Sequence, residues 1–446
     1  MFRDRSESDF WKHLLPQYAC VYGPLALGLM LIILGYYFNS SAYCRYGGIA
    51  MVAGFAVGLF TPKLRGYRFT FWILIANITA LLSPDSFKSI GQFPLNNSWL
   101  MMVVVQLIMF GMGTQMSFRD FAKVGKMPYA VLVGLCCQFI IMPLLGFSLA
   151  KLFQFPDEIA AGVILIGSCS SGLASNVMTY LARGNLALSV AITAIATLLA
   201  PIFTPLWMKY LASSFIKVNA LAMSLDIVKM VIVPILAAFT HDWLSQESGA
   251  IRKSVKLAIL ISSIWLCFLV VGGWNRISST VSNEDLLQLL GLLGFFAAAI
   301  VFGYVYHQLT LVFKTIDQAM PKVSMTGIVF FTLITTAYGS EHLKEVGLLL
   351  LLASFLHNVL GYFFGYCGGR LLGLNRSDAK TVAIEVGTQN GSMGVGIATN
   401  MNKLDTVGLA SIVFAPLMNV TGSILANYWR RQSSVDAEIE SDPKPY

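Results

Sequence analysis

The sequence predicts an all-α polytopic membrane protein, and two observations carry that prediction. Of its 446 residues, 56% are hydrophobic and only 12% are charged, whereas a soluble domain carries about 25% charged residues. Apolar runs of about 20 residues recur along nearly the whole chain, which is the length a helix needs to cross a hydrocarbon core about 30 Å thick. A soluble fold is thereby excluded.

The apolar runs predict fourteen membrane spans. In chain order they lie near 19–38, 45–60, 69–84, 99–116, 128–150, 158–182, 186–208, 223–240, 257–274, 286–306, 323–339, 346–369, 380–400 and 406–428. If the N-terminus is cytoplasmic, twenty-one Lys and Arg residues lie in inside segments and eight in outside segments, with Lys229 inside a span. This positive-inside bias predicts a multi-pass protein of the cell (inner) membrane with both termini cytoplasmic.

The net charge of +8 has the same explanation. The basic residues lie between the apolar runs rather than in one patch, so they indicate orientation in the bilayer and not a nucleic-acid partner.

One acidic side chain falls inside a predicted span. Every other Asp or Glu lies in a tail, a loop or near a span end, but Glu385 lies within the span 380–400. Placing a carboxylate there costs about 2.5–3.5 kcal/mol on insertion scales, so such residues are rare and usually functional. Gln389, Asn390 and Ser392 add further oxygen atoms to the same segment. We therefore expect a functional site around Glu385.

Two spans carry small and polar residues at mid-depth, in the stretches Ser168–Asn176 and Glu385–Ser392. Such stretches favour local unwinding, which membranes tolerate only where the backbone is buried in protein or lines a cavity. For the first stretch, close helix packing through small residues is an equal alternative. The carboxylate of Glu385 makes close helix packing a weaker explanation for the second stretch.

The positions of the two stretches indicate an inverted repeat. Residues 69–209 form a segment of 141 residues, and 223–429 form one of 142 once 257–321 is set aside as an insertion. The polar stretches begin 99 and 97 residues into these halves, and an odd number of spans separates them. Transporters often repeat a helical unit in inverted topology, with a broken helix at the same place in each half.

Four runs show a specific resemblance. They are Cys137-Gln-Phe-Ile-Ile-Met-Pro143, Ala174-Ser-Asn-Val-Met-Thr-Tyr-Leu-Ala-Arg-Gly-Asn-Leu-Ala-Leu-Ser-Val190, Ile384-Glu-Val-Gly-Thr-Gln-Asn390 and Asn419-Val-Thr-Gly-Ser-Ile-Leu-Ala-Asn-Tyr-Trp429. Here the chain resembles the bile acid:sodium symporter family, and its bacterial members most. The resemblance covers roughly 69–256 and 321–430, and it implies a ten-helix core with a panel domain and a core domain in which two broken helices cross.

The resemblance also implies a division of the chain. Two helix pairs, at 19–60 and 257–306, fall outside the family's core. We expect an N-terminal extension with two spans at 1–62, the first repeat and the start of the second at 63–256, an inserted helix pair at 257–320, the rest of the second repeat at 321–430, and a cytoplasmic tail at 431–446.

Position by position, the resemblance implies two sodium sites that share one glutamate. One site takes Ser175, Asn176, Ser189, Thr193 and Glu385, and the other takes Gln138, Glu385, Gln389 and the backbone carbonyls of Val386 and Thr388. Hydroxyl, amide, carbonyl and carboxylate oxygens are what a hard cation prefers. Two alternatives stay open: Ser189 and Thr193 could bond to their own helix backbone, and Gln138 could make an interhelical hydrogen bond.

The implied function is sodium-coupled symport of an organic anion, bile-acid-like or a small carboxylate, by alternating access. The resemblance places Asn390 and Asn419 at the substrate cavity. The family's usual Pro-Gly-Gly-Thr is replaced here by Ser170-Ser171-Gly172-Leu173, so the cavity differs and bile acids themselves are not implied.

Three other functions remain open. In a sodium-independent or proton-coupled carrier, Glu385 would relay a proton. A non-transporting membrane sensor would use the two added helix pairs. An enzyme would need a second catalytic group, and the sequence has no paired acid, zinc motif or serine–histidine arrangement beside Glu385. We therefore expect a protein that is not an enzyme.

Overall fold

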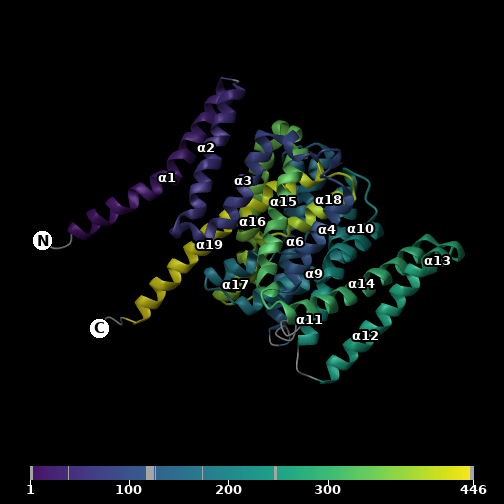
Figure 1. The fold of residues 1–446 in the computed structure, drawn as a ribbon. Helices are drawn as coiled ribbons and strands as arrows, with labels where there is room; N and C mark the ends of the chain where they lie inside the picture. The colour runs from purple at the N-terminus through teal and green to yellow at the C-terminus, as the bar shows by residue number, and fades with distance from the viewer. Residues whose placement is uncertain are drawn as a thin grey trace. The chain divides into compact units, whose positions relative to one another are not determined.

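The computed structural model describes residues 4–38, 40–116, 125, 127–172, 174–245 and 249–441. Over these residues the regular structure is helical, apart from one short hairpin and one isolated bridge (Figure 1). In the hairpin, β1 (Ser89–Ile90) pairs antiparallel with β2 (Phe93–Pro94), with Ser89 opposite Pro94. The residues form two compact units, which we describe in turn.

The first unit comprises residues 1–97 and 328–345. Its elements are α1 (Asp4–Tyr37), α2 (Ser41–Phe60), the 3-10 helix η1 (Pro62–Tyr67), α3 (Arg68–Leu82), the 3-10 helix η2 (Pro84–Phe87), the hairpin, and the adjoining ends of α15 and α16. Helices α1 and α2 pack closely because Gly28 faces Gly47. A Cβ on either glycine would lie 2.7 Å from the other's carbonyl oxygen, and small residues allow this approach between membrane helices.

The second unit comprises residues 98–327 and 346–446. Its first elements are α4 (Ser98–Gly113), α6 (Pro128–Leu152), α7 (Asp157–Ser168), α8 (Ala174–Leu181), α9 (Leu186–Leu211), the 3-10 helix η3 (Ala212–Ser214), α10 (Ala220–Ile227), the π-helix η4 (Val228–Ile232) and α11 (Val233–Ser245). Then follow α12 (Gly249–Phe268), the π-helix η5 (Leu269–Gly273), α13 (Trp274–Thr280), α14 (Glu284–Val312), α15 (Ile316–Tyr338), α16 (Ser340–Leu371), α17 (Arg376–Gly387), α18 (Gly391–Asn400) and α19 (Val407–Ser441).

The described helices agree with the predicted spans. Nine helical segments are long and apolar enough to cross a membrane, and three shorter apolar helices lie at 20–35, 68–82 and 99–113. Each matches one predicted span. The two spans with polar stretches are instead divided, into α7 and α8 and into α17 and α18. The chain is therefore an all-helical polytopic membrane protein, while the domain boundaries at 62, 256 and 320 stay predictions.

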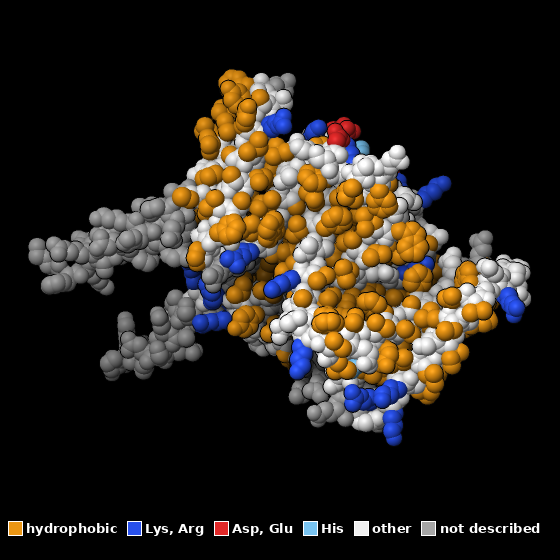
Figure 2. All heavy atoms as spheres, viewed as in Figure 1, with side chains coloured by type: hydrophobic (Ala, Val, Ile, Leu, Met, Phe, Trp, Pro, Cys, Tyr) orange, Lys and Arg blue, Asp and Glu red, His pale blue; other side chains and the backbone are white. Residues whose placement is uncertain are grey.

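The pair formed by α12 and α14 exposes most of its apolar side chains. Leu257, Leu260 and Ile261 of α12 and Leu293 of α14 are all more than half exposed, and Figure 2 shows hydrophobic side chains over much of the visible face. Contiguous apolar surface of this extent is unsuited to water. It suits the hydrocarbon surroundings that the span lengths predict.

Candidate functional site

The interruptions of the two broken spans pair with each other. One lies between α7 and α8 and the other between α17 and α18, and an antiparallel bridge joins Ser171 of the first to Gln389 of the second. The backbone N–H of Asn390 donates to the carbonyl oxygen of Ser170 at 2.8 Å. Unwound backbone inside a membrane protein needs such partners. The two interruptions provide them for each other across more than 200 residues of sequence.

Gly172 allows the two interruptions to approach. Its N–H donates to the carbonyl oxygen of Thr388 at 3.4 Å, and a Cβ at this position would lie 3.0 Å from the carbonyl oxygen of Gln389. A larger residue would push the paired segments apart. The glycine is therefore part of the pairing.

Glu385, on α17, is completely buried. One carboxylate oxygen, Oε1, accepts a hydrogen bond from Ser189 Oγ on α9. The other, Oε2, accepts from Ser171 Oγ at 2.6 Å and from Thr193 Oγ1 at 2.8 Å. Within the described residues no Lys, Arg or His forms an ion pair with it. Its charge is thus met by three hydroxyl groups, and hydrogen bonds to charged groups contribute about 1.5–3 kcal/mol each.

The other residues of the first predicted sodium site join this network. Ser175 Oγ lies 3.3 Å from Thr193 Oγ1, and Ser189 Oγ is within 2.8 Å of Asn176 Oδ1. The alternative in which Ser189 and Thr193 bond to their own helix is not observed. Thr197, one turn further along α9, does bond back, from Oγ1 to the carbonyl oxygen of Thr193 at 2.7 Å.

The residues of the second predicted site also lie together. Gln138 Nε2, on α6, donates to Gln389 Oε1 at 3.0 Å and to the Cys169 carbonyl oxygen at 3.1 Å, so the predicted interhelical hydrogen bond exists. Gln389 Nε2 donates to the Val386 carbonyl oxygen at 2.8 Å. Two buried oxygens of the group, Gln138 Oε1 and Thr388 Oγ1, have no hydrogen-bond partner within the part of the chain that the structure describes. Burying an oxygen without a partner costs free energy unless a donor or a cation binds it.

Asn390 and Asn419, predicted to face the substrate, are both nearly buried. Asn390 Oδ1 caps α18 by accepting from the N–H of Met393 at 3.1 Å, and its Nδ2 has no hydrogen-bond partner among the residues described. Asn419 Nδ2 donates to the carbonyl oxygen of Ala415 at 2.9 Å. A Cβ on Gly391, beside Asn390, would lie 3.0 Å from Ala415 Cβ. Both asparagines therefore border the turn of α19 that holds Ala415.

Two polar residues of α16 contact backbone carbonyl oxygens, one of them at the second interruption. Asn358 Nδ2 donates to the carbonyl oxygen of Gly387 at 2.7 Å, at the end of α17. His357 Nε2 lies 2.9 Å from the carbonyl oxygen of Met142 on α6, as expected of a histidine that packs in the core. These contacts satisfy backbone groups next to the site.

Sequence reasoning missed the role of Ser171. The residue was noted only as a departure from a family motif, and its contact with Glu385 depends on the exact path of an unwound segment. The available signal was its position in the polar stretch Ser168–Asn176. Leu173, in the same motif, lies outside the described residues.

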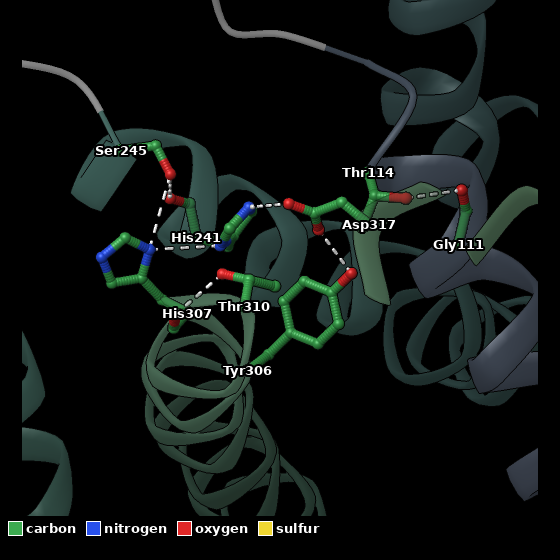
Figure 3. A network of polar contacts seen from close by, with 8 residues as sticks. All are labelled: Gly111, Thr114, His241, Ser245, Tyr306, His307, Thr310 and Asp317. Atoms are coloured by element: carbon green, nitrogen blue, oxygen red, sulfur yellow. Dashed lines mark hydrogen bonds and ion pairs between the residues drawn. The ribbon is translucent and has the colours of Figure 1, made fainter. Parts of the chain in front are cut away.

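A second polar cluster, also missed, joins α11, α14 and α15 (Figure 3). His241 Nε2 lies 3.5 Å from Asp317 Oδ2, and Tyr306 OH donates to Asp317 Oδ1 at 2.6 Å. His241 Nδ1 and His307 Nδ1 are 3.3 Å apart, and Ser245 Oγ is 3.5 Å from His307 Nδ1. Through α14, this cluster connects the helix pair predicted as an insertion at 257–320 to the neighbouring helix α11. It shares no residue with the network around Glu385.

Comparisons with known proteins identify the family. Residues 102–280 match the Sodium Bile acid symporter family. A protein of Bacillus subtilis, described as the uncharacterized sodium-dependent transporter YocS, is 31% identical over 82% of this chain and 92% of its own length. The probable sodium/metabolite cotransporter BASS1 of Arabidopsis thaliana chloroplasts is 30% identical over 83% of this chain and 75% of its own length. The human ileal sodium/bile acid cotransporter is 34% identical over 40% of this chain and 51% of its own.

The chain therefore belongs to the sodium bile acid symporter family. It is a membrane protein of a transporter family and not an enzyme, as the sequence predicts. Among solved structures, the sodium proton antiporter MjNhaP1 of Methanocaldococcus jannaschii aligns over 94% of this chain and 99% of its own, with a TM-score of 0.41 and 13% identity. That likeness is too distant to place any residue.

Proposed function

We propose that the protein carries an organic anion across the membrane together with sodium, and that two sodium ions share Glu385. The observation that supports this most strongly is the environment of that carboxylate. It is buried, lacks an ion-pair partner among the described residues, and accepts hydrogen bonds from three hydroxyls. A charge in this position needs a compensating charge in some state of the cycle. A cation supplies it, and the surrounding atoms are the oxygen ligands that sodium prefers.

The two proposed sodium sites share Glu385 and otherwise use different residues. Ser175, Asn176, Ser189 and Thr193 provide the first, from α8 and α9. Gln138, Gln389 and the carbonyls of Val386 and Thr388 provide the second, where Gln138 Oε1 and Thr388 Oγ1 have no hydrogen-bond partner among the described residues. One negative charge between two cations explains why neither site has a second carboxylate.

Alternating access follows from the proposed inverted repeat. In such carriers two halves rock about a central site formed by discontinuous helices. The paired interruptions would form that centre, so sodium bound beside them would hold them in one arrangement. Helix ends next to the interruptions add partial charges, with carbonyl ends toward cations and amide ends available to an anion. The termini are proposed to be cytoplasmic, from the distribution of Lys and Arg.

The proposed stoichiometry provides enough energy for accumulation. With two sodium ions per monoanion, one net positive charge enters, which is worth about 2.3 kcal/mol per 100 mV. A tenfold sodium gradient adds about 1.4 kcal/mol per ion. The total of about 5 kcal/mol sustains an accumulation of several thousandfold.

The substrate is proposed only as an organic anion near Asn390 and Asn419, because Ser170 and Ser171 replace the family's proline and glycine.

The decisive experiment is a sodium titration of thermal stability and of uptake into proteoliposomes, with choline keeping ionic strength constant. A screen of organic anions by thermal shift, in sodium and in potassium, identifies the substrate. Wild type should be stabilised by sodium and further by one class of anion, whereas Glu385→Gln should show neither effect. A wild-type protein that responds to pH but not to sodium at fixed pH would instead establish the proton-coupled carrier. Sodium stabilisation without flux of any anion would favour the membrane sensor.

A further inference from the structure

We propose that Ser171 is an additional oxygen ligand of the sodium ion held beside Glu385, in a position where the family motif has no side-chain oxygen. The inference rests on the proposed function. Ser171 is completely buried, and its Oγ donates to Glu385 Oε2 at 2.6 Å and lies 3.3 Å from Thr193 Oγ1. It therefore touches two members of the first proposed site while belonging to the unwound segment that none of the other members occupies.

The spacing of the oxygens suits a shared cation. The atoms Ser171 Oγ, Thr193 Oγ1, Ser175 Oγ and Glu385 Oε2 are linked by distances of 2.6, 2.8, 3.3 and 3.3 Å. Six oxygens around a cation at about 2.4 Å stand about 3.4 Å from their neighbours. An ion entering this group thus requires the closest oxygens to separate by up to about 0.8 Å and the hydroxyl hydrogens to turn away.

The neighbouring serine shows that the contact is specific to one position. Ser170 is equally buried, but among the described residues its hydroxyl contacts only Met393 Sδ, at 3.8 Å, and Thr197 Oγ1, at 3.5 Å. It does not touch Glu385. Two adjacent serines in one unwound segment therefore have different environments, and only Ser171 faces the carboxylate.

The position of Ser171 gives the ligand a second role. Its backbone pairs with Gln389 in the bridge between the interruptions, and Gln389 belongs to the second proposed sodium site. In the sodium-free state the Ser171 hydroxyl donates to Glu385. When sodium binds, the hydroxyl hydrogen turns away and a lone pair faces the ion. Sodium at the first site thereby shifts the unwound segment that pairs with Gln389, a ligand of the second proposed site. This pairing couples the binding of the two ions.

The test compares three variants of two neighbouring residues. Ser171→Ala removes the oxygen, Ser171→Cys keeps the volume but replaces the oxygen with a soft sulfur, and Ser170→Ala is the matched control. Purified full-length protein is titrated with NaCl, with choline chloride keeping ionic strength constant, and the sodium concentration at half-maximal thermal stabilisation is measured. We expect that concentration to rise about tenfold in both Ser171 variants, the loss of one ligand. Ser170→Ala should stay within about twofold of wild type.

A purely structural role for Ser171 would give another pattern. It would lower the melting temperature in choline and leave the half-maximal sodium concentration unchanged, and that result overturns the proposal. A lower half-maximal concentration also overturns it, because Ser171 would then compete with sodium for Glu385. If Ser171→Ala does not fold, Ser171→Cys gives the same decision. If wild type shows no response to sodium, the proposed function itself is refuted. If wild type and the Ser171 variants respond at the same sodium concentration and only Glu385→Gln fails to respond, the role of Ser171 alone is refuted.

Discussion

Replacing Glu385 by glutamine should abolish sodium stabilisation with little effect on the sodium-free protein. The side chain keeps its size and an acceptor oxygen, and its new NH₂ group can donate to one of the surrounding hydroxyls, which can rotate to accept. What disappears is the negative charge. Because both proposed sites use that charge, both should fail together.

The expected magnitudes come from the contacts of the carboxylate. Three hydroxyl hydrogen bonds to a charged group become bonds to a neutral one, which loses about 1–1.5 kcal/mol per bond. Removing a charge from the membrane interior returns about 2.5–3.5 kcal/mol. The two effects nearly cancel, so in potassium the variant should unfold within a few degrees of wild type. Sodium at a hundred times its dissociation constant stabilises wild type by about 2.7 kcal/mol per site, and this increment should vanish.

The assay is thermal unfolding in detergent, in NaCl and in KCl of equal concentration. The matched control is Glu158→Gln, the same substitution on α7 at a carboxylate that pairs with Lys403 outside the network. The control should keep the wild-type difference between NaCl and KCl. If Glu385→Gln keeps more than half of that difference, the shared-carboxylate reasoning is wrong.

Three further predictions concern neighbouring contacts. Gly172→Val should abolish uptake and destabilise the protein by about 1–3 kcal/mol through overpacking, as measured by flux and thermal denaturation; full uptake would contradict the close pairing of the interruptions. Gln138→Leu should lower the Hill coefficient for sodium toward one, because it removes the donor to Gln389 Oε1, and an unchanged coefficient would argue against a second site there. Asp317→Leu should lower the melting temperature, since Tyr306 OH loses its acceptor at a cost of about 1–3 kcal/mol. The sodium concentration at half-maximal stabilisation should stay the same, and a change in that concentration would connect this cluster to transport.

Much of the fold was readable from the sequence because bilayer thickness fixes the length of apolar runs. The interruption of the span around Glu385 was readable for a similar reason, since polar residues at mid-depth are rare in membrane helices. The contacts of Ser189 and Thr193 with Glu385 could be expected only through the family resemblance, because a spacing of four residues fits equally well with bonds to their own helix backbone. Asp226 and Lys229 have the spacing of a helical ion pair, and Lys229 Nζ lies 3.7 Å from Asp226 Oδ1.

The remaining contacts depend on tertiary geometry that no local pattern encodes. Ser171 contacts Glu385 only because its unwound segment pairs with a second one more than 200 residues away. The cluster of His241, His307 and Asp317 forms only where three helices meet, and each residue alone reads as an ordinary polar residue near a helix end. Sequence periodicity shows which face of a helix is apolar, but it does not show which distant side chain lies opposite.

The pairing of the interruptions also fits the proposal that one carboxylate serves two ions. Helix α17 ends two residues after Glu385, so the acid lies in its last turn, where the backbone carbonyl groups have no partners within the helix. The same turn therefore carries the full negative charge of the carboxylate and the partial negative charge of the helix end. Hydroxyls of α9 lie on one side of the acid, and Gln389 follows it on the other. A cation on each side would therefore meet the carboxylate together with either hydroxyls or carbonyls, and removing either ion would leave the other interruption held by fewer contacts.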